Sequence, residues 1–309
     1  MDSTIYKRKA PLLVFLIPAF AFLGVFLFYP FLQNVINTFL KIGGLGRAPE
    51  GLNDPWYENY ARMMTDPYLG TALKNTLLMM GATIVFQVGI ALGLALLVDT
   101  IPRRGAEFFR TVYFFPIVIS ATALGLMFNL IFLYKGGMVN QLLLAMGRLE
   151  TETKASGKVL ITWLDWKDQS RFLFTMFLPV MWQYVGFYFV ILVTGLNNID
   201  QDLYEAAALD GADGWKRTRY ITLPLLRNVL CTCLVLAITG ALKVFDLPWV
   251  MFGAGMPQNQ GWLTGTYMYD QTFNRMNVDY GSTIAVLIVV LGVVISGISN
   301  RIFRPSEDY

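Results

Sequence analysis

Long apolar segments constrain the fold of this chain more than any other feature of its sequence. A helix needs about 20 predominantly apolar residues to cross the roughly 30 Å hydrocarbon core of a bilayer. Six segments of the 309-residue chain reach that length, at residues 12–40, 72–98, 112–133, 172–196, 228–252 and 280–300. Charged residues make up only 15% of the sequence, against about 25% in an ordinary soluble domain. We therefore expect an all-α membrane protein with six transmembrane helices.

Missing residue types exclude several kinds of chemistry. The sequence has no histidine, which removes histidine general-base catalysis and most zinc sites. Cys231 and Cys233 are two positions apart in an apolar segment, so on a helix they point to different sides and neither pair nor chelate. The sequence has no Gly-x-x-x-x-Gly-Lys-Ser/Thr loop for ATP. We expect a chain that moves a solute across the bilayer, without enzyme activity, a bound cofactor or a metal, and the net charge of +3 gives no reason to expect nucleic acid.

Positive charges in the connections predict the orientation of the helices. Short basic clusters at 103–104 and 216–219 fall on the same predicted side of the bilayer. Cytoplasmic loops carry an excess of lysine and arginine, and short loops carry the most weight. We therefore expect both termini and the connection 197–227 to be cytoplasmic, which leaves the longer loop 134–171 outside.

The connection 197–227 has the signals of a helix, a turn and a second helix. Asp200 or Asp202 can cap a helix start, Gly211 is a natural left-handed stop, and Pro224 suits the first turn of the next transmembrane helix. The alanines 206–208 make a helix face with little side-chain bulk. Such a face favours close approach by another backbone, and the alternative interpretation is an ordinary solvated connector.

The same connection carries a family resemblance. It reads Glu205-Ala206-Ala207, then Gly211, then Ile221-x-Leu223-Pro224. In residue type and spacing this pattern resembles the EAA loop of binding-protein-dependent ABC importer permeases. The chain is most similar to their carbohydrate-uptake branch, of the maltose and glycerol-phosphate type. Supporting residues of that branch are Asp202-Leu203-Tyr204, Lys243-Val244-Phe245-Asp246-Leu247-Pro248, Gly253-x-Gly255-x-Pro257, Tyr267-x-Tyr269 and Tyr280-Gly281-Ser282.

The resemblance implies a fold, a location and partners. The fold is the MetI-like core of type I importer permeases at 71–302, preceded at 1–70 by a tail, the first helix and an outer loop, and followed by a cytoplasmic tail at 303–309. The location is the bacterial plasma membrane, the inner membrane of the cell. There a second, different permease subunit completes the path, two ATPase subunits bind ATP and Mg²⁺, and an extracytoplasmic binding protein delivers a sugar or oligosaccharide.

The resemblance also gives the EAA loop a role. The helix expected at 202–210 corresponds to the coupling helix, which lies in a cleft of one ATPase subunit and carries its closure to the transmembrane helices. The coupling residues that it implies are Glu205, Ala206, Ala207, Asp210 and Gly211. Glu205 is expected to face basic or polar groups of the ATPase, and Gly211 to allow the turn.

Candidate solute-path residues follow from the same resemblance. It places Gln183, Tyr184 and Phe187 of the fourth apolar segment, and Gly240, Ala241 and Val244 of the fifth, at solute-lining positions. Aromatic rings and an amide suit a sugar, and aromatic packing between helices is the alternative. Because the fifth-segment positions are apolar, we expect the partner permease to supply much of the grip on the solute.

Two charged residues, Lys243 and Asp246, fall inside the fifth apolar segment. Charge in a bilayer is costly, so a functional role is the default expectation. On a continuous helix they share a face and can neutralise each other; the alternative is direct contact with the solute. In either case they should face protein or a water-filled cavity.

Two rival functions remain at this point. One is a permease of the same architecture for a polyol or a glycerol phosphate ester, although no cluster of arginines in the fourth or fifth segment favours an anion. The other is a secondary transporter driven by an ion gradient, which needs membrane-embedded acids, whereas the six segments contain only Asp246.

Overall fold

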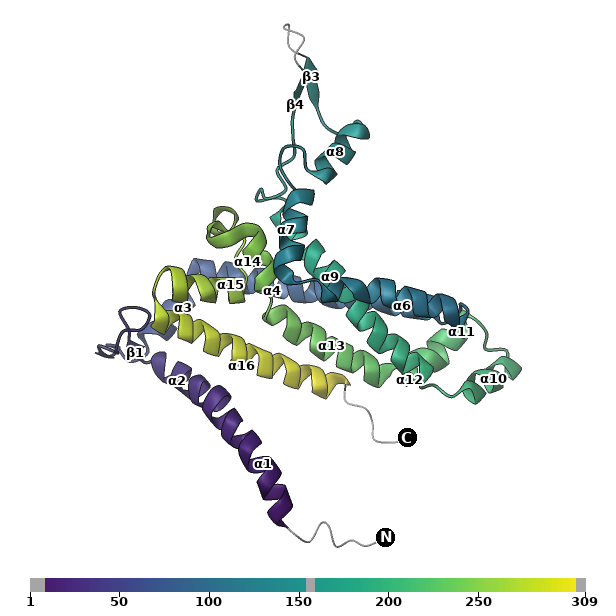
Figure 1. The fold of residues 1–309 in the computed structure, drawn as a ribbon, viewed down its shortest axis with the longest axis horizontal. Coiled ribbons are helices and arrows are strands. Elements are labelled where there is room, and N and C mark those ends of the chain that lie inside the picture. The colour runs from purple at the N-terminus through teal and green to yellow at the C-terminus, as the bar shows by residue number, and fades with distance from the viewer. Residues whose placement is uncertain (1–8, 154–158, 304–309) are drawn as a thin grey trace. The chain divides into compact units, whose positions relative to one another are not determined.

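The computed structural model describes residues 9–153 and 159–303, which fold mostly into helices (Figure 1). Within these residues, five helical segments are long and apolar enough to cross a membrane, namely Val14–Asn37, Pro67–Val98, Phe172–Asn197, Arg227–Phe252 and Val278–Ser299. A sixth span results if Arg104–Val118 and Ala121–Ile131, which meet at a bend of 94°, count as one. The prediction of an all-α membrane protein is confirmed.

Contacts divide the chain into two compact units. One contains the residues up to Asp66 together with Met268–Val289, and the other contains Pro67–Tyr267 together with the residues from Val290 onward. This division does not test the domain limits expected from the sequence, at residues 70 and 302, which stay a prediction.

The first unit begins with one long apolar helix in three parts. These are α1 (Lys9–Leu23), the π-helical turn Gly24–Phe28 and α2 (Tyr29–Asn37). Pro30 lies in the first turn of α2, and because proline has no N–H to give to the preceding turn, the helix widens locally instead of ending. No part of its most apolar stretch is buried among the described residues, so its side chains are available to lipid or to another chain.

Polar contacts hold the rest of the first unit. The Thr38 hydroxyl lies 2.9 Å from the Tyr60 hydroxyl, and Asn59 donates to the Thr38 carbonyl at 3.1 Å. The Tyr280 hydroxyl donates to the Asp66 carboxylate at 2.7 Å. These contacts join the end of α2 to α3 (Glu58–Thr65), and Asp66 to the start of α16 (Val278–Phe303). The same unit contains β1 (Leu40–Lys41), its antiparallel partner β2 (Gly51–Leu52) and the π-helical turn Asp270–Asn274.

The second unit is built on helices that pack through small residues. A side chain at Gly186 would collide with the backbone of Tyr113, so α6 and α9 are in direct backbone contact. Ala91, Ala95 and Ala237 are almost fully buried in the same core. The helices concerned are α4 (Pro67–Ala82), the π-helical turn η3 (Thr83–Val88), α5 (Gly89–Val98), α6 (Arg103–Val118), α9 (Phe172–Asn197) and α13 (Arg227–Leu242).

The third apolar segment does not form the single straight helix expected at 112–133. It contains the end of α6 and all of α7 (Ala121–Ile131), separated by a sharp bend. Pro116 lies in the last turn of α6, and the Ser120 hydroxyl caps α7 by accepting from the Ala123 N–H at 3.2 Å. Pro116 near the end of α6 and the Ser120 cap at the start of α7 together divide a segment that is apolar throughout.

The fifth apolar segment is also interrupted. α13 ends at Leu242, and α14 (Asp246–Phe252) begins after the irregular residues 243–245. Pro248 lies in the first turn of α14, where its missing N–H prevents the hydrogen bond that would continue α13 through Val244. A side chain at Gly265, in α15 (Thr264–Tyr269), would approach the Val244 carbonyl to 3.2 Å, so α15 packs closely against the interruption.

The loop 134–171 is ordered in the residues that the structure describes. Figure 1 shows α7 leading away from α6 toward α8 (Met138–Ala145) and a hairpin of β3 (Thr151–Thr153) and β4 (Val159–Ile161). Asn140 of α8 is fully buried, donates to the carbonyls of Tyr134 and Leu164 at 2.9 Å each, and accepts from the Trp166 indole at 3.1 Å. One amide therefore joins both ends of the loop.

Candidate functional site

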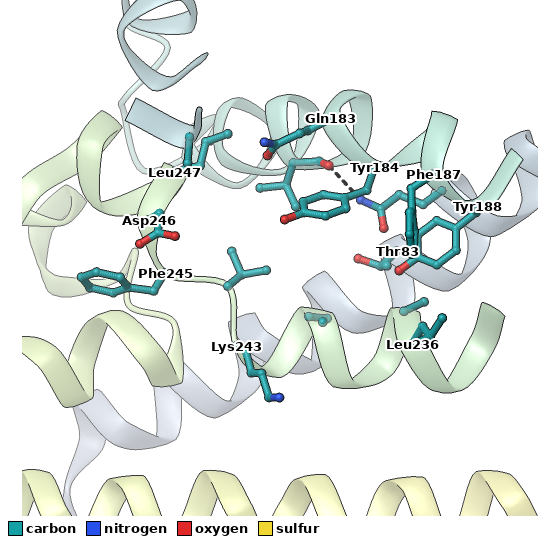
Figure 2. A pocket seen from close by; sticks show the side chains of 17 residues that line it. Thr83, Gln183, Tyr184, Phe187, Tyr188, Leu236, Lys243, Phe245, Asp246 and Leu247 are labelled. Carbon is teal, nitrogen blue, oxygen red and sulfur yellow. Dashed lines mark hydrogen bonds between the residues drawn. The ribbon is translucent and has the colours of Figure 1, made fainter. Parts of the chain in front are cut away.

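A cavity of about 280 Å³ lies in the second unit, where the interruption of the fifth segment faces α9. Its walls come from η3, from α9, from the last turns of α13 and from residues 243–247 (Figure 2). The interrupted backbone opens this space, because residues 243–245 leave the path that a continuous helix would follow.

All of the solute-path residues expected from the sequence line this one cavity. They are Gln183, Tyr184, Phe187, Gly240, Ala241, Lys243, Val244 and Asp246. Phe187 is three positions from Tyr184 and four from Gln183, and residues at these spacings lie on the same face of a helix, which brings the three α9 side chains to the same wall. Contact with a solute stays a prediction for all of these residues.

Among the lining residues that were not expected from the sequence are two polar ones of η3. Thr83 and Gln87 of η3 are both buried polar residues that line the cavity. Their spacing of four positions inside an otherwise apolar segment was an available signal, because polar residues in a transmembrane segment almost always face the protein interior or a water-filled space.

Hydrogen bonds fix the two glutamines of the cavity. Gln87 donates to the Val180 carbonyl of α9 at 2.8 Å, the contact drawn as a dashed line in Figure 2. Gln183 donates to the Ile119 carbonyl at 3.3 Å. Because Ile119 lies at the bend between α6 and α7, its carbonyl has left the helical pattern, and Gln183 satisfies it. Both amides are thus held in place by backbone acceptors.

Lys243 and Asp246 do not form the neutralising pair that the sequence suggested as one alternative. Both residues are exposed, and among the described residues no ion pair joins them. Figure 2 shows their side chains pointing apart. The expectation assumed a continuous helix, whereas Lys243 follows the C-terminus of α13 and Asp246 begins α14. Each charge therefore complements the dipole of its own helix end.

The loop 134–171 and α7 hold α14 at the edge of the cavity. Lys167 donates to the Met251 carbonyl at 2.7 Å, and Asn129 of α7 donates to the Val250 carbonyl at 3.3 Å. Burial lowers the pKa of Lys167 below its usual value, with Asp165 opposing that shift. A side chain at Gly125 would collide with Val250, so α7 lies directly against α14.

The connection 197–227 has the local structure that its residues predicted. α10 (Gln201–Leu209) starts and ends one residue before the expected limits. The Asp200 carboxylate caps its start by accepting from the Asp202 N–H at 3.1 Å. Gly211 has a φ of +72°, and the Ala212 N–H donates back to the Ala207 carbonyl at 2.9 Å. The elements that follow are α11 (Trp215–Arg217), the π-helical turn Thr218–Thr222 and α12 (Leu223–Leu225).

Most of the α10 surface is open. Glu205, Ala206, Asp210 and Gly211 are exposed, whereas Ala207 is buried. Leu209, which the sequence analysis did not select, is 90% exposed at the end of the helix. An isolated exposed leucine is ordinary, but together with the exposed Ala206, three positions earlier, Leu209 gives α10 an apolar edge.

Comparison with known proteins identifies the chain. Residues 88–308 match the family described as the inner membrane component of binding-protein-dependent transport systems. The chain belongs to this family. The permease is 32% identical to the "Probable ABC transporter permease protein YurN" of Bacillus subtilis, over 96% of each chain. It is 29% identical to the "Lactose transport system permease protein LacF" of Rhizobium radiobacter, over 92% of this chain and 90% of that protein.

A solved structure confirms the fold of the permease. A chain from the crystal structure of a bacterial alginate ABC transporter, in complex with an alginate-bound periplasmic protein, matches with a TM-score of 0.80. The match covers 97% of the permease and 96% of that chain at 20% identity. The resemblance to ABC importer permeases and the fold expected from it are therefore confirmed, and the permease is a component of membrane transport.

Proposed function

We propose that the permease forms the membrane path of an ATP-driven importer for a sugar or oligosaccharide that an extracytoplasmic binding protein delivers. The observation that carries the proposal is the cavity at the interrupted fifth segment, with Tyr184 and Phe187 beside fixed amides. Rings and amides are the groups that stack on and hydrogen-bond to sugars. The names of several relatives support it, including LacF and an arabinooligosaccharide permease of Bacillus subtilis that is 27% identical over 96% of this chain.

Lys243 supports a second candidate solute. It is an exposed cation at the cavity wall, which suits an anionic glycoside or a glycerol phosphate ester. One relative, the sulfoquinovosyl glycerol permease SmoG of Agrobacterium fabrum, is 28% identical over 94% of this chain. A neutral sugar remains the first candidate, because Asp246 places an opposing charge on the same cavity.

The proposed partners are two ATPase subunits at α10 and a second permease at the solute path. α10, with exposed Glu205 and Leu209, meets one of two ATPase subunits that bind ATP and Mg²⁺. A second, different permease completes the path. Family membership favours this arrangement over an ion-coupled transporter, which would have no use for the EAA loop.

Native mass spectrometry of the complex purified through this chain tests the proposal. The expected composition is one copy of the chain, one different permease and two ATPase subunits, because the apolar positions Gly240 and Val244 suit an unequal sharing of the solute. ATP hydrolysis by that complex should rise when loaded binding protein is added. Two copies of this chain with no second permease, or a complex without an ATPase, would contradict the proposal.

The proposed orientation puts both termini and α10 in the cytoplasm. A thiol placed at Trp215, which is 73% exposed, should not react with an impermeant reagent added to intact cells once Cys231 and Cys233 have been replaced. A thiol at Leu160, in the exposed β4 strand, should react. The reverse labelling pattern would show that the proposed orientation is wrong.

A further inference from the structure

Arg110 is a charged residue that neither the cavity nor α10 uses. It lies on α6 about 10 Å along the axis from the start of that helix at 1.5 Å per residue, close to where the apolar segment begins. Its Nε is buried, and among the described residues that atom has no hydrogen-bond partner. Buried polar groups are almost always satisfied, so packing within the chain does not account for Arg110, whose side chain as a whole is only half-buried.

Arg110 lines two neighbouring hollows of opposite character. One, of about 490 Å³, also has Asp99 from the end of α5 and Asn197 from the end of α9 on its wall. The other, of about 400 Å³, is open and almost entirely apolar. Besides Arg110 it is lined by Thr111, Phe114, Phe115, Val118 and Val190. The second hollow therefore continues from Arg110 along the apolar part of α6.

The charges of the polar hollow fit a zwitterion. Arg110 supplies one cation and Asp99 one anion, and no ion pair joins the two among the described residues. A guanidinium binds phosphate through parallel hydrogen bonds. A primary ammonium can donate three hydrogen bonds, which suits the Asp99 carboxylate and the Asn197 carbonyl oxygen. A ligand that carries only negative charge would be repelled by the Asp99 carboxylate.

We propose that this site binds one diacyl phospholipid with a phosphoethanolamine headgroup. The phosphate meets Arg110, the ammonium meets Asp99 and Asn197, and an acyl chain lies in the groove formed by Phe114, Phe115 and Val118. These groove side chains are exposed in the chain itself, as lipid contacts require. The site lies at the same helix ends as α10, which is the cytoplasmic leaflet in the orientation proposed above.

Lipid binding to the purified, delipidated complex tests the proposal. Phosphatidylethanolamine, phosphatidylglycerol and phosphatidylcholine with identical acyl chains are titrated, and bound lipids are counted by native mass spectrometry. Phosphatidylethanolamine should bind on the order of tenfold more tightly than phosphatidylcholine, because the latter has no N–H to donate to Asp99. Arg110→Gln should lose this binding, whereas Arg104→Gln, a matched change at an exposed arginine of the same helix, should keep it.

Two further variants keep the test decisive. Asp99→Asn should leave phosphate binding but abolish the preference for phosphatidylethanolamine over phosphatidylglycerol, and it carries the test alone if Arg110→Gln fails to fold. Arg110→Lys should bind at an intermediate level. Equal binding by Arg110→Gln and Arg104→Gln would overturn the proposal. So would equal binding of phosphatidylcholine, or competition by glycerophosphoethanolamine as strong as that by the intact lipid. Lipid counts do not depend on transport, so failure here leaves the importer assignment untouched.

Discussion

Glu205→Lys and Gly211→Val should each leave the permease inserted in the membrane and paired with its partner permease, yet cut uptake on the order of tenfold or more. Glu205 is exposed on α10, so reversing its charge alters the surface offered to the ATPase and no packed core. Gly211 has a φ of +72° with nothing within 4 Å of an added Cβ. The Cβ of valine therefore meets no neighbouring residue, and the expected cost is a local backbone penalty of about 1–3 kcal/mol.

Matched variants separate coupling from folding. Glu152→Lys makes the same charge change at an exposed position of the outer hairpin and should leave uptake normal. Gly211→Asn should restore uptake, because asparagine tolerates the left-handed region that valine avoids. The measurements are uptake, co-purification of the ATPase and membrane abundance. Normal uptake by both Glu205→Lys and Gly211→Val at normal abundance would remove α10 from the coupling path.

Replacing Tyr184 and Phe187 together by alanine should impair uptake on the order of tenfold. Either the concentration of sugar-loaded binding protein that gives half-maximal uptake should rise, or the maximal rate should fall. Each ring is expected to contribute about 1 kcal/mol of stacking, and every 1.4 kcal/mol corresponds to a factor of about ten. The binding protein's own affinity for sugar should not change. Stimulated ATP hydrolysis and uptake are measured in parallel.

Trp182→Ala is the matched control for the cavity. Trp182 adjoins Gln183 on α9 but lines a separate apolar groove against α6 and η3, so its removal should leave sugar uptake near normal. If Trp182→Ala and the double variant lose uptake equally, the aromatic residues of α9 act in helix packing and the proposed solute contact is wrong.

Lys243→Gln distinguishes the two candidate solutes. A neutral sugar should still be taken up by this variant, because its hydrogen bonds come from the amides and the rings. An anionic glycoside or phosphate ester should lose uptake, since it would lose its countercharge in the cavity. Uptake that depends strictly on Lys243 would therefore replace the neutral sugar by an anionic solute.

Local rules account for what the sequence predicted well. The cap at Asp200 and the left-handed stop at Gly211 depend on residues within one turn, and both have the expected structure. The limits of α10 differ from the prediction by one residue at each end. The family resemblance brought together side chains from α9 and α13 that no local pattern places on the same cavity.

Interrupted helices account for what the sequence did not predict. Hydropathy is continuous through 112–133 and 228–252, whereas the breaks depend on proline positions and on contacts made far along the chain. Gln183 meets the Ile119 carbonyl only after folding, and α15 packs against Val244 through Gly265. The predicted pairing of Lys243 with Asp246 was wrong for the same reason. It assumed one continuous helix, whereas α13 ends at Leu242.

Uptake by proteoliposomes that contain the purified complex tests the central claim most directly, namely that this chain forms the path of an ATP-driven importer. The probe is a labelled form of the sugar that co-purifies with the binding protein of the complex. It should enter only with loaded binding protein on the outer side and ATP on the ATPase side, and the permease alone should neither transport it nor hydrolyse ATP. Uptake driven by a proton or sodium gradient without ATP would contradict the account.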